Sequence, residues 1–123
     1  MNTGLKFAAI DIGSNAIRLL LSAVFETDEG PFFRKISLIR MPIRLGEEAF
    51  IQQRISTAKI DQMVQTITGF RHLMEAYQPL SHRACATSAM REAQNQAAIC
   101  DLVEQRSGIR IQVIDGKEEA DIF

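Results

Sequence analysis

The sequence predicts an α/β fold in which helices cover a mixed β-sheet, and three observations lead to this prediction. Three apolar, strand-like runs follow one another with only short turns between them, which is typical of an antiparallel meander. Two further strand-like runs each follow a helical pattern, as in the crossovers that join parallel strands. The hydrophobic content of 46% in 123 residues is enough for one buried core. We therefore expect one domain with the element order β-β-β-α-β-α-β-α.

The first three strands are predicted over residues 7–12, 17–25 and 32–41. A polar turn rich in Glu, Asp, Gly and Pro separates the second strand from the third. Apolar and polar side chains alternate only imperfectly along the third run, and strands that are buried on both faces show this pattern. We therefore expect the third strand to be covered on both sides.

The first long helix is predicted to begin after Ser56, which is a favourable N-cap residue. Apolar side chains then recur at steps of three and four residues, which places them on one helix face. These side chains are Ile60, Met63, Val64, Ile67, Phe70, Met74 and Tyr77. Pro79 ends the pattern. The preceding residues, 47–54, are expected to form either a short helix or a mobile loop.

The second half of the chain alternates between strands and helices. Residues 82–87 predict a short strand and residues 89–93 a helical turn. Asn95 is expected to cap a further helix, which Gly108 closes as its C′ residue. The buried face of that helix is predicted to hold Ala98, Ile99, Leu102 and Val103, and the last strand to hold Ile109, Ile111, Val113 and Ile114. A final helix is expected from Gly116 to the end of the sequence.

Composition narrows the class of protein. The 14 basic and 15 acidic residues nearly cancel, so net charge gives no reason to expect a nucleic-acid or membrane partner. A local basic run without acidic residues comprises Arg34, Lys35, Arg40 and Arg44. Cys85 and Cys100 lie in apolar patterns and are expected to be reduced, buried thiols. No signal peptide and no stretch near the ~20 apolar residues of a membrane span is visible, so we expect a cytoplasmic protein.

Three segments that leave predicted strands carry polar groups, and ligands collect at such exits in α/β sheets. The first is Asp11 followed by a small Gly-Ser-Asn turn, which can aim backbone N–H groups at a phosphate and a carboxylate at a metal ion or a water. The second spans residues 86–93 and ends in an arginine, and the third spans 115–120 and holds two glutamates. Each alone also fits turn hydrogen bonds, helix caps or a surface ion pair. Together they favour hydrolysis of a phosphoanhydride.

The residues of these exits carry a resemblance to a known family. The motifs are Ala9-Ile10-Asp11-Ile12-Gly13-Ser14-Asn15 with Arg18-Leu19, Arg44-Leu45-Gly46, Ala86-Thr87-Ser88-Ala89-Met90-Arg91-Glu92-Ala93 with Asn95, and Gly116-Lys117-Glu118-Glu119-Ala120. In this order and spacing the sequence resembles the N-terminal part of the exopolyphosphatase / guanosine pentaphosphate phosphohydrolase (Ppx/GppA) family, in the sugar kinase–heat-shock–actin ATPase superfamily. The resemblance covers essentially the whole chain.

The resemblance implies a ribonuclease H-like sheet that forms one lobe of an actin-like ATPase fold. It also implies a Mg²⁺-dependent enzyme that releases orthophosphate from polyphosphate ends or converts guanosine pentaphosphate to tetraphosphate. By the same resemblance, Glu119 is the catalytic glutamate, Arg91 contacts the phosphate chain, Gly13, Ser14 and Asn15 form the first phosphate-binding loop, and Asp11 helps to hold the metal ion. Residues 1–123 would then be the N-terminal lobe of a longer protein, inactive alone, with the remaining lobe as its partner and a homodimer as a possible assembly.

Two departures from the family pattern keep an alternative open. Ala16 stands where the loop usually has another hydroxyl residue, and residues 47–54 replace a Gly-rich segment. The alternative is a non-catalytic regulatory protein of the same fold that binds a phosphorylated ligand. A kinase of the same superfamily is a third reading, which the glutamate motif disfavours.

Overall fold

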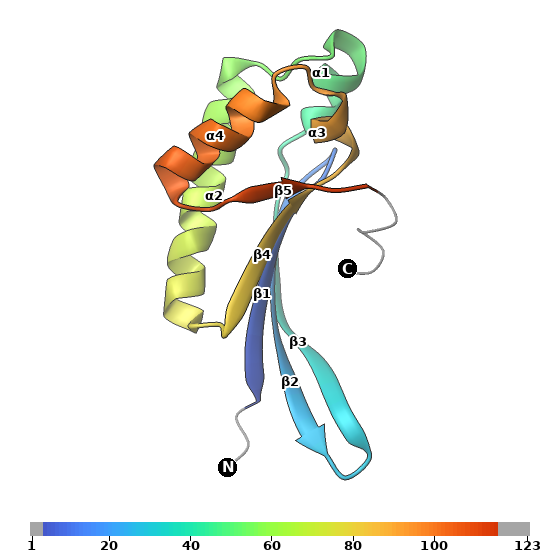
Figure 1. Cartoon of the computed structure of the whole chain (residues 1–123), viewed down its shortest axis with the longest axis vertical. Helices are drawn as coiled ribbons and strands as arrows, with labels where there is room; N and C mark the ends of the chain where they lie inside the picture. The colour runs from blue at the N-terminus through green and yellow to red at the C-terminus, as the bar shows by residue number, and fades with distance from the viewer. Residues whose placement is uncertain (1–3, 116–123) are drawn as a thin grey trace.

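The computed structural model describes residues 4–115 and shows one mixed sheet within them. Its strands are β1 (Leu5–Ile12), β2 (Ile17–Thr27), β3 (Gly30–Met41), β4 (Ser81–Ala86) and β5 (Ile111–Val113). The spatial order is β3-β2-β1-β4-β5 (Figure 1). Strands β1, β2 and β3 pair antiparallel, whereas β4 runs parallel to β1 and β5 parallel to β4. The predicted α/β fold, with its meander and its two parallel crossovers, is therefore confirmed.

The helices are α1 (Leu45–Gln52), α2 (Thr57–Tyr77), α3 (Ser88–Glu92) and α4 (Gln96–Ser107). Figure 1 shows α2 and α4 together on one face of the sheet, with α1 and α3 at the end where β1 and β4 terminate. The segment that was expected to be a short helix or a mobile loop is thus the helix α1. No helix within residues 4–115 combines the length and the apolar character that crossing a membrane requires.

The core lies between the sheet and the two long helices. The predicted stripe of α2 faces inward, and Met63, Val64, Ile67, Phe70 and Met74 are buried on it. From the sheet, β1 and β2 contribute side chains that alternate toward the same face, because successive residues of a strand point to opposite sides. These are Ala8, Ile10, Ile12, Ile17, Leu19 and Leu21. Each fully buried large aliphatic side chain contributes about 1.5–3 kcal/mol, so this layer is what holds the strand ends in place.

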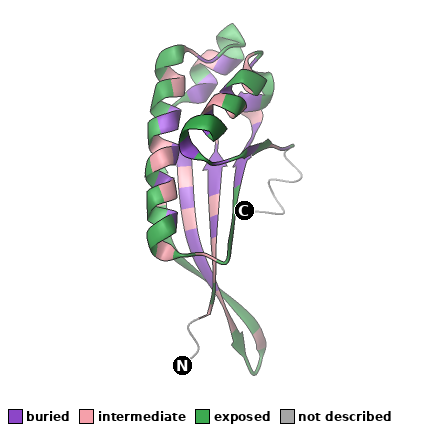
Figure 2. Cartoon of the chain, turned by 60° about the vertical axis from the view of Figure 1, so that its left-hand side comes forward, coloured by how far each residue is buried: buried purple, intermediate pink, exposed green. Residues whose placement is uncertain are grey.

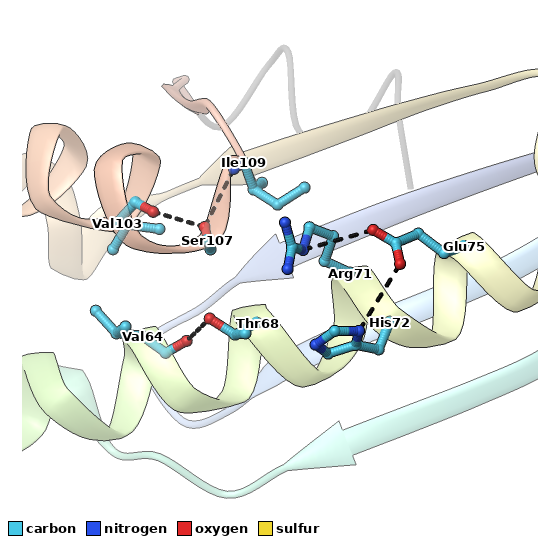
Figure 3. Close-up of polar contacts among 8 residues, drawn as sticks. All are labelled: Val64, Thr68, Arg71, His72, Glu75, Val103, Ser107 and Ile109. Carbon is cyan, nitrogen blue, oxygen red and sulfur yellow. Dashed lines mark hydrogen bonds and ion pairs between the residues drawn. The ribbon is translucent and has the colours of Figure 1, made fainter.

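Local hydrogen bonds define the ends of the two long helices. The hydroxyl oxygen of Ser56 accepts from the Lys59 N–H (3.3 Å), which confirms Ser56 as the N-cap of α2. At the end of α4, the buried Ser107 hydroxyl donates to the Val103 carbonyl (2.6 Å) and accepts from the Ile109 N–H (3.1 Å), as Figure 3 shows. Gly108 then adopts a left-handed φ of 76°, as predicted, and the chain turns into β5.

Figure 3 also shows contacts between charged or polar side chains along α2. Arg71 and His72 both approach Glu75, with nitrogen–oxygen distances of 3.7 Å. Exposed pairs of this kind contribute about 0–1 kcal/mol, so they add little to the stability that the buried stripe supplies.

The expectation that the third strand is covered on both sides is wrong. β3 is the edge strand of the sheet and is exposed along nearly all of its length. Figure 2 shows the β2–β3 hairpin extending beyond the helices, with exposed residues at its tip. The apolar side chains Phe32, Phe33, Ile36 and Leu38 are each about half exposed. A one-residue bulge breaks the alternation, because Leu21 pairs with Ser37 and Ser22 with Lys35.

The predicted position of Asn95 as the N-cap residue of α4 is confirmed, but its side chain does not cap the helix. Asn95 occupies the residue before α4, but its side chain makes no hydrogen bond to that helix. Its amide instead accepts from the Ile55 N–H (3.2 Å) and donates to the Ile55 carbonyl (2.9 Å). Asn95 therefore joins the start of α4 to the α1–α2 connection. On α4 itself, Ile99 and Val103 are buried as expected, whereas Ala98 is exposed.

The last strand is shorter than predicted, since β5 covers only Ile111–Val113. Ile109 and Ile114 flank it and are buried, so the apolar pattern was a pattern of burial and not of strand pairing. The helix expected from Gly116 lies outside the described residues.

Candidate functional site

The site is built where β1 and β4 end. These strands are parallel, and their last residues, Ile12 and Ala86, are partners in the register. The N–H of Thr87 donates to the Ile12 carbonyl (3.2 Å), which closes the pairing. The turn after β1 and the start of α3 are therefore neighbours, and the hydroxyl oxygens of Ser14 and Ser88 lie 3.0 Å apart. Two of the three predicted exits thus meet at one edge of the sheet.

The turn between β1 and β2 presents backbone N–H groups. The N–H of Gly13 donates to the Ala16 carbonyl (3.0 Å), and a Cβ on Gly13 would lie only 3.3 Å from that oxygen. Within the described part of the chain, the N–H groups of Ser14 and Asn15 have no hydrogen-bond partner. Successive free N–H groups in a tight turn are a typical binding site for a phosphate oxygen.

Helix α1 fixes the same turn from the other side. The N–H of Gly46 donates to the Ser14 carbonyl (2.9 Å). A Cβ at position 46 would lie 3.0 Å from Cβ of Ser14 and 3.1 Å from the Phe50 ring, so only glycine permits this close approach without displacement. Leu45 beside it is fully buried and anchors the start of the helix.

Asp11 is the charged centre of the site and is only 3% exposed. Its neighbour across the hairpin is Arg18, whose Nε lies 2.9 Å from Oδ2 of Asp11 and whose terminal nitrogen contacts the same oxygen. The other oxygen, Oδ1, is buried and has no hydrogen-bond partner. A buried carboxylate oxygen without a partner calls for a bound ion or water, because leaving it unpaired costs about 1–3 kcal/mol or more.

These groups line one shallow depression of about 370 Å³. Its lining residues are Asp11, Gly13, Ser14, Asn15, Ala16, Arg18, Arg40, Thr87 and Ser88. The structure therefore brings together four of the residues singled out from the sequence, namely the aspartate and the three residues of the turn. Thr87 lines this depression from the position before α3, and its side chain makes no capping hydrogen bond to that helix.

The two remaining predicted site residues are placed differently. Arg91 lies on α3 but does not line the depression, and its guanidinium donates to the carbonyl of Ile114. The N–H of Ile114 in turn donates to the Ala86 carbonyl (2.9 Å), so the chain leaves β5 beside the end of β4. Glu119 lies outside the described residues. The phosphate contact of Arg91 and the catalytic role of Glu119 therefore stay predictions.

Sequence reasoning missed Arg18 and Arg40 as members of the site. Arg18 was available from the hairpin itself, because pairing Ile12 with Ile17 places residue 18 opposite Asp11. Arg40 was not available in this way. It faces Arg18 only through the register of β2 with β3, and a bulge shifts that register between the tight turn of the hairpin and Arg18.

The donor set fits a magnesium ion that has one protein carboxylate as a ligand and keeps several waters. Mg²⁺ keeps several waters and is usually bound through one or two carboxylates together with substrate phosphate oxygens. Asp11 supplies one such carboxylate with a free oxygen. Among the described residues, no group of three or more His, Cys, Asp or Glu side chains gathers to form a larger site.

The chain is similar to known proteins in sequence and in fold. A sequence model of the Ppx/GppA phosphatase family matches residues 23–123. Exopolyphosphatase 1 of Mycobacterium tuberculosis is 26% identical over 116 residues, which cover 94% of this chain and 33% of that protein. Two crystal structures share the fold at 24% identity, each over 94% of this chain and 36% of the other. They are the Aquifex aeolicus member of the Ppx/GppA family, with a TM-score of 0.83, and an exopolyphosphatase from Cytophaga hutchinsonii, with 0.81.

The chain thus spans about a third of the length of the relatives that it matches. The family match extends over most of the sequence, and the five-stranded sheet superposes on that of solved members along nearly the whole chain. On both grounds, the chain belongs to the Ppx/GppA phosphatase family.

Proposed function

We propose that the protein is a Mg²⁺-dependent phosphoanhydride hydrolase. It releases orthophosphate from the ends of polyphosphate or converts guanosine pentaphosphate to tetraphosphate, and residues 1–123 form its N-terminal lobe. The observation that supports this proposal most directly is that one depression holds both the free N–H groups of the turn after β1 and the unpartnered carboxylate oxygen of Asp11. Family membership, and relatives that are named exopolyphosphatases, support the choice of substrate.

The described residues bind and orient the terminal phosphate. The N–H groups of Ser14 and Asn15 donate to its oxygens, and the hydroxyl groups of Ser14 and Ser88, which share a hydrogen bond of 3.0 Å, leave one O–H as a further donor. Arg18 lies beside them and contributes positive charge, although one of its roles is to hold Asp11. Donors that are fixed in place before the reaction stabilise charge on the transferred phosphoryl group at little reorganisation cost.

Asp11 would hold the metal ion through Oδ1, directly or through water. When bound, a Mg²⁺ ion neutralises phosphate oxygens and helps to orient the scissile bond. The pairing of Oδ2 with Arg18 leaves Oδ1 as the carboxylate oxygen without a partner.

The chemical step transfers the terminal phosphoryl group to water. The water oxygen forms a bond to the terminal phosphorus, the bridging P–O bond breaks, and the shortened chain leaves with the bridging oxygen. We propose that Glu119 takes the proton of the attacking water, as the family resemblance implies. Arg91 donates from one terminal nitrogen to the Ile114 carbonyl and has further N–H donors with which it would contact the chain.

Phosphate release by the full-length protein tests this proposal. Polyphosphate and guanosine pentaphosphate are offered with Mg²⁺, and wild type is compared with Glu119→Gln and with Glu118→Gln as the matched control. We expect the first variant to lose at least a hundredfold in kcat and the control to change little, since a general base contributes about 10²–10⁴-fold. Equal activity in wild type and Glu119→Gln would contradict the assigned role, and failure of the wild type to release phosphate would contradict the function.

A non-catalytic phosphate-binding protein is the second candidate. Two observations favour it, namely that Arg91 does not line the depression and that Ala16 supplies no hydroxyl group. Calorimetry separates the two candidates: binding of polyphosphate without any phosphate release supports the regulatory protein. The cytoplasmic location and a homodimer stay predictions.

A further inference from the structure

We propose that a row of cations on β2 and β3 continues the phosphate site and binds the phosphates that follow the terminal one in a linear phosphate chain. The row, called here the cation path, consists of Arg18, Arg40 and Lys35. This inference rests on the proposed function, because it extends the same depression. It assigns a binding role to Arg40 and Lys35, two residues of the basic run that have no role in the proposed reaction.

The sheet register places the three cations on one face, opposite α2 and α4. Arg18 on β2 pairs with Arg40 on β3, so their Cβ atoms lie about 5 Å apart. Lys35 pairs with Ser22, four residues further along β2, at about 13 Å. The bulge leaves Ile36 without a partner on β2 and returns Lys35 to the face of Arg40. Without this bulge, alternation would turn Lys35 toward the other face.

The surface between these cations is continuous. Arg18 and Arg40 line the depression that holds the Gly13–Asn15 turn. Arg18 and Lys35 line a second, smaller depression of about 100 Å³, whose floor includes Leu20 and Leu38. Asp11 and Arg18 belong to both depressions, which therefore adjoin at that ion pair. A long ligand whose end is bound at the Gly13–Asn15 turn can therefore extend through both depressions to Lys35.

The charges of the path call for an anion. Like charges on directly opposite strand positions repel, and Arg18 and Arg40 are such a pair. Asp11 compensates Arg18, whereas Arg40 and Lys35 have no ion-pair partner within the described residues. Among the described residues that line the two depressions, Asp11 is the only carboxylate. A linear phosphate chain carries about one negative charge per phosphate and matches this row once its end occupies the turn.

The chain offers a matched control for the test. Arg34 is adjacent to Lys35 and exposed, but it pairs with Ala23 and therefore lies on the opposite face. The probes are long-chain polyphosphate and orthophosphate, and binding to the full-length protein is measured by calorimetry in EDTA, which prevents Mg²⁺-dependent turnover. The variants are Lys35→Gln, Arg40→Gln and Arg34→Gln.

We expect Lys35→Gln and Arg40→Gln each to weaken binding of the long chain by roughly three- to tenfold. Each should also make the salt dependence shallower: the magnitude of the negative slope of log affinity against log salt should fall by about one, as loss of one phosphate contact does in nucleic-acid complexes. Lys35→Gln should leave orthophosphate binding within about twofold, because Lys35 lies far from the turn, and Arg34→Gln should match wild type.

Several outcomes overturn the path. Equal losses in Arg34→Gln and Lys35→Gln would show a non-specific effect of net charge. A single-stranded oligonucleotide of similar length that binds as tightly, and is weakened equally, would show a general polyanion surface. If wild type releases phosphate but Lys35→Gln and Arg40→Gln bind the long chain normally, the path is wrong and the function stands. If the variants lose chain binding but wild type releases no phosphate, the path stands and the hydrolase proposal is wrong.

Discussion

Asn95 provides a sharp test of the structure, because a capping role and a bridging role predict opposite results for one substitution. Asn and Ser are nearly equivalent N-cap residues, so Asn95→Ser would change stability by only a few tenths of a kcal/mol if Asn95 capped α4. In the structure, the amide accepts from the Ile55 N–H (3.2 Å) and donates to its carbonyl (2.9 Å). A serine hydroxyl is too short to make both contacts.

The magnitude follows from these two hydrogen bonds. Each contributes about 1 kcal/mol, and Ile55 is only 1% exposed, so water does not readily replace the lost partners. We therefore expect Asn95→Ser to destabilise the α1–α2 connection by about 2 kcal/mol. Because about 1.4 kcal/mol corresponds to a tenfold change, hydrogen exchange at the Ile55 amide should accelerate roughly thirtyfold.

Amide hydrogen exchange of the full-length protein measures this effect locally. The control is Gln94→Ser, which removes an exposed side-chain hydrogen bond to Gln53 (3.3 Å) and should leave exchange at Ile55 unchanged. Unaltered exchange at Ile55 in Asn95→Ser would refute the bridging role and favour the capping interpretation of Asn95.

Two further predictions concern local packing. Gly46→Ala brings a Cβ to 3.0 Å from Cβ of Ser14 and should weaken orthophosphate binding several-fold, whereas Gly69→Ala, with nothing within 4 Å, should raise stability by up to about 1 kcal/mol. Calorimetry measures orthophosphate binding and thermal unfolding measures stability in each variant. Equal effects of the two substitutions would contradict the close approach at Gly46. Burial, and then the charge of Asp101, raise the pKa of the Cys100 thiol, so it should react more slowly with a disulfide reagent at pH 7 than a free cysteine does and should gain reactivity only at higher pH. Rapid reaction at pH 7 would contradict this assignment.

The sequence predicted best what local periodicity determines. The apolar stripe of α2 has a fixed spacing, and its position on the chain matched the structure. The same reasoning failed for β3, because an imperfect alternation arises equally from a strand buried on both faces and from an edge strand with a bulge. Which of these occurs depends on strand order, and strand order is set by contacts between distant segments.

The site shows the same division. Asp11 and the Gly13–Asn15 turn were recognisable because a strand, a carboxylate and small residues follow one another in the sequence. Asn95 and Arg40 were not, because their partners, Ile55 and Arg18, are distant in the chain. An asparagine before a helix favours a cap on local grounds, and only the packing of α4 beside the α1–α2 connection redirects its side chain.

The most direct test of the central claim is the Mg²⁺ dependence of phosphate release in Asp11→Asn. The full-length protein is offered polyphosphate over a titration of Mg²⁺, and the unfolding temperature of the variant is recorded beside that of wild type. We predict that wild type requires Mg²⁺ and that a folded Asp11→Asn protein requires at least about tenfold more, because it loses a charged ligand oxygen. The same Mg²⁺ requirement in both proteins, or phosphate release without a divalent cation, would contradict the account.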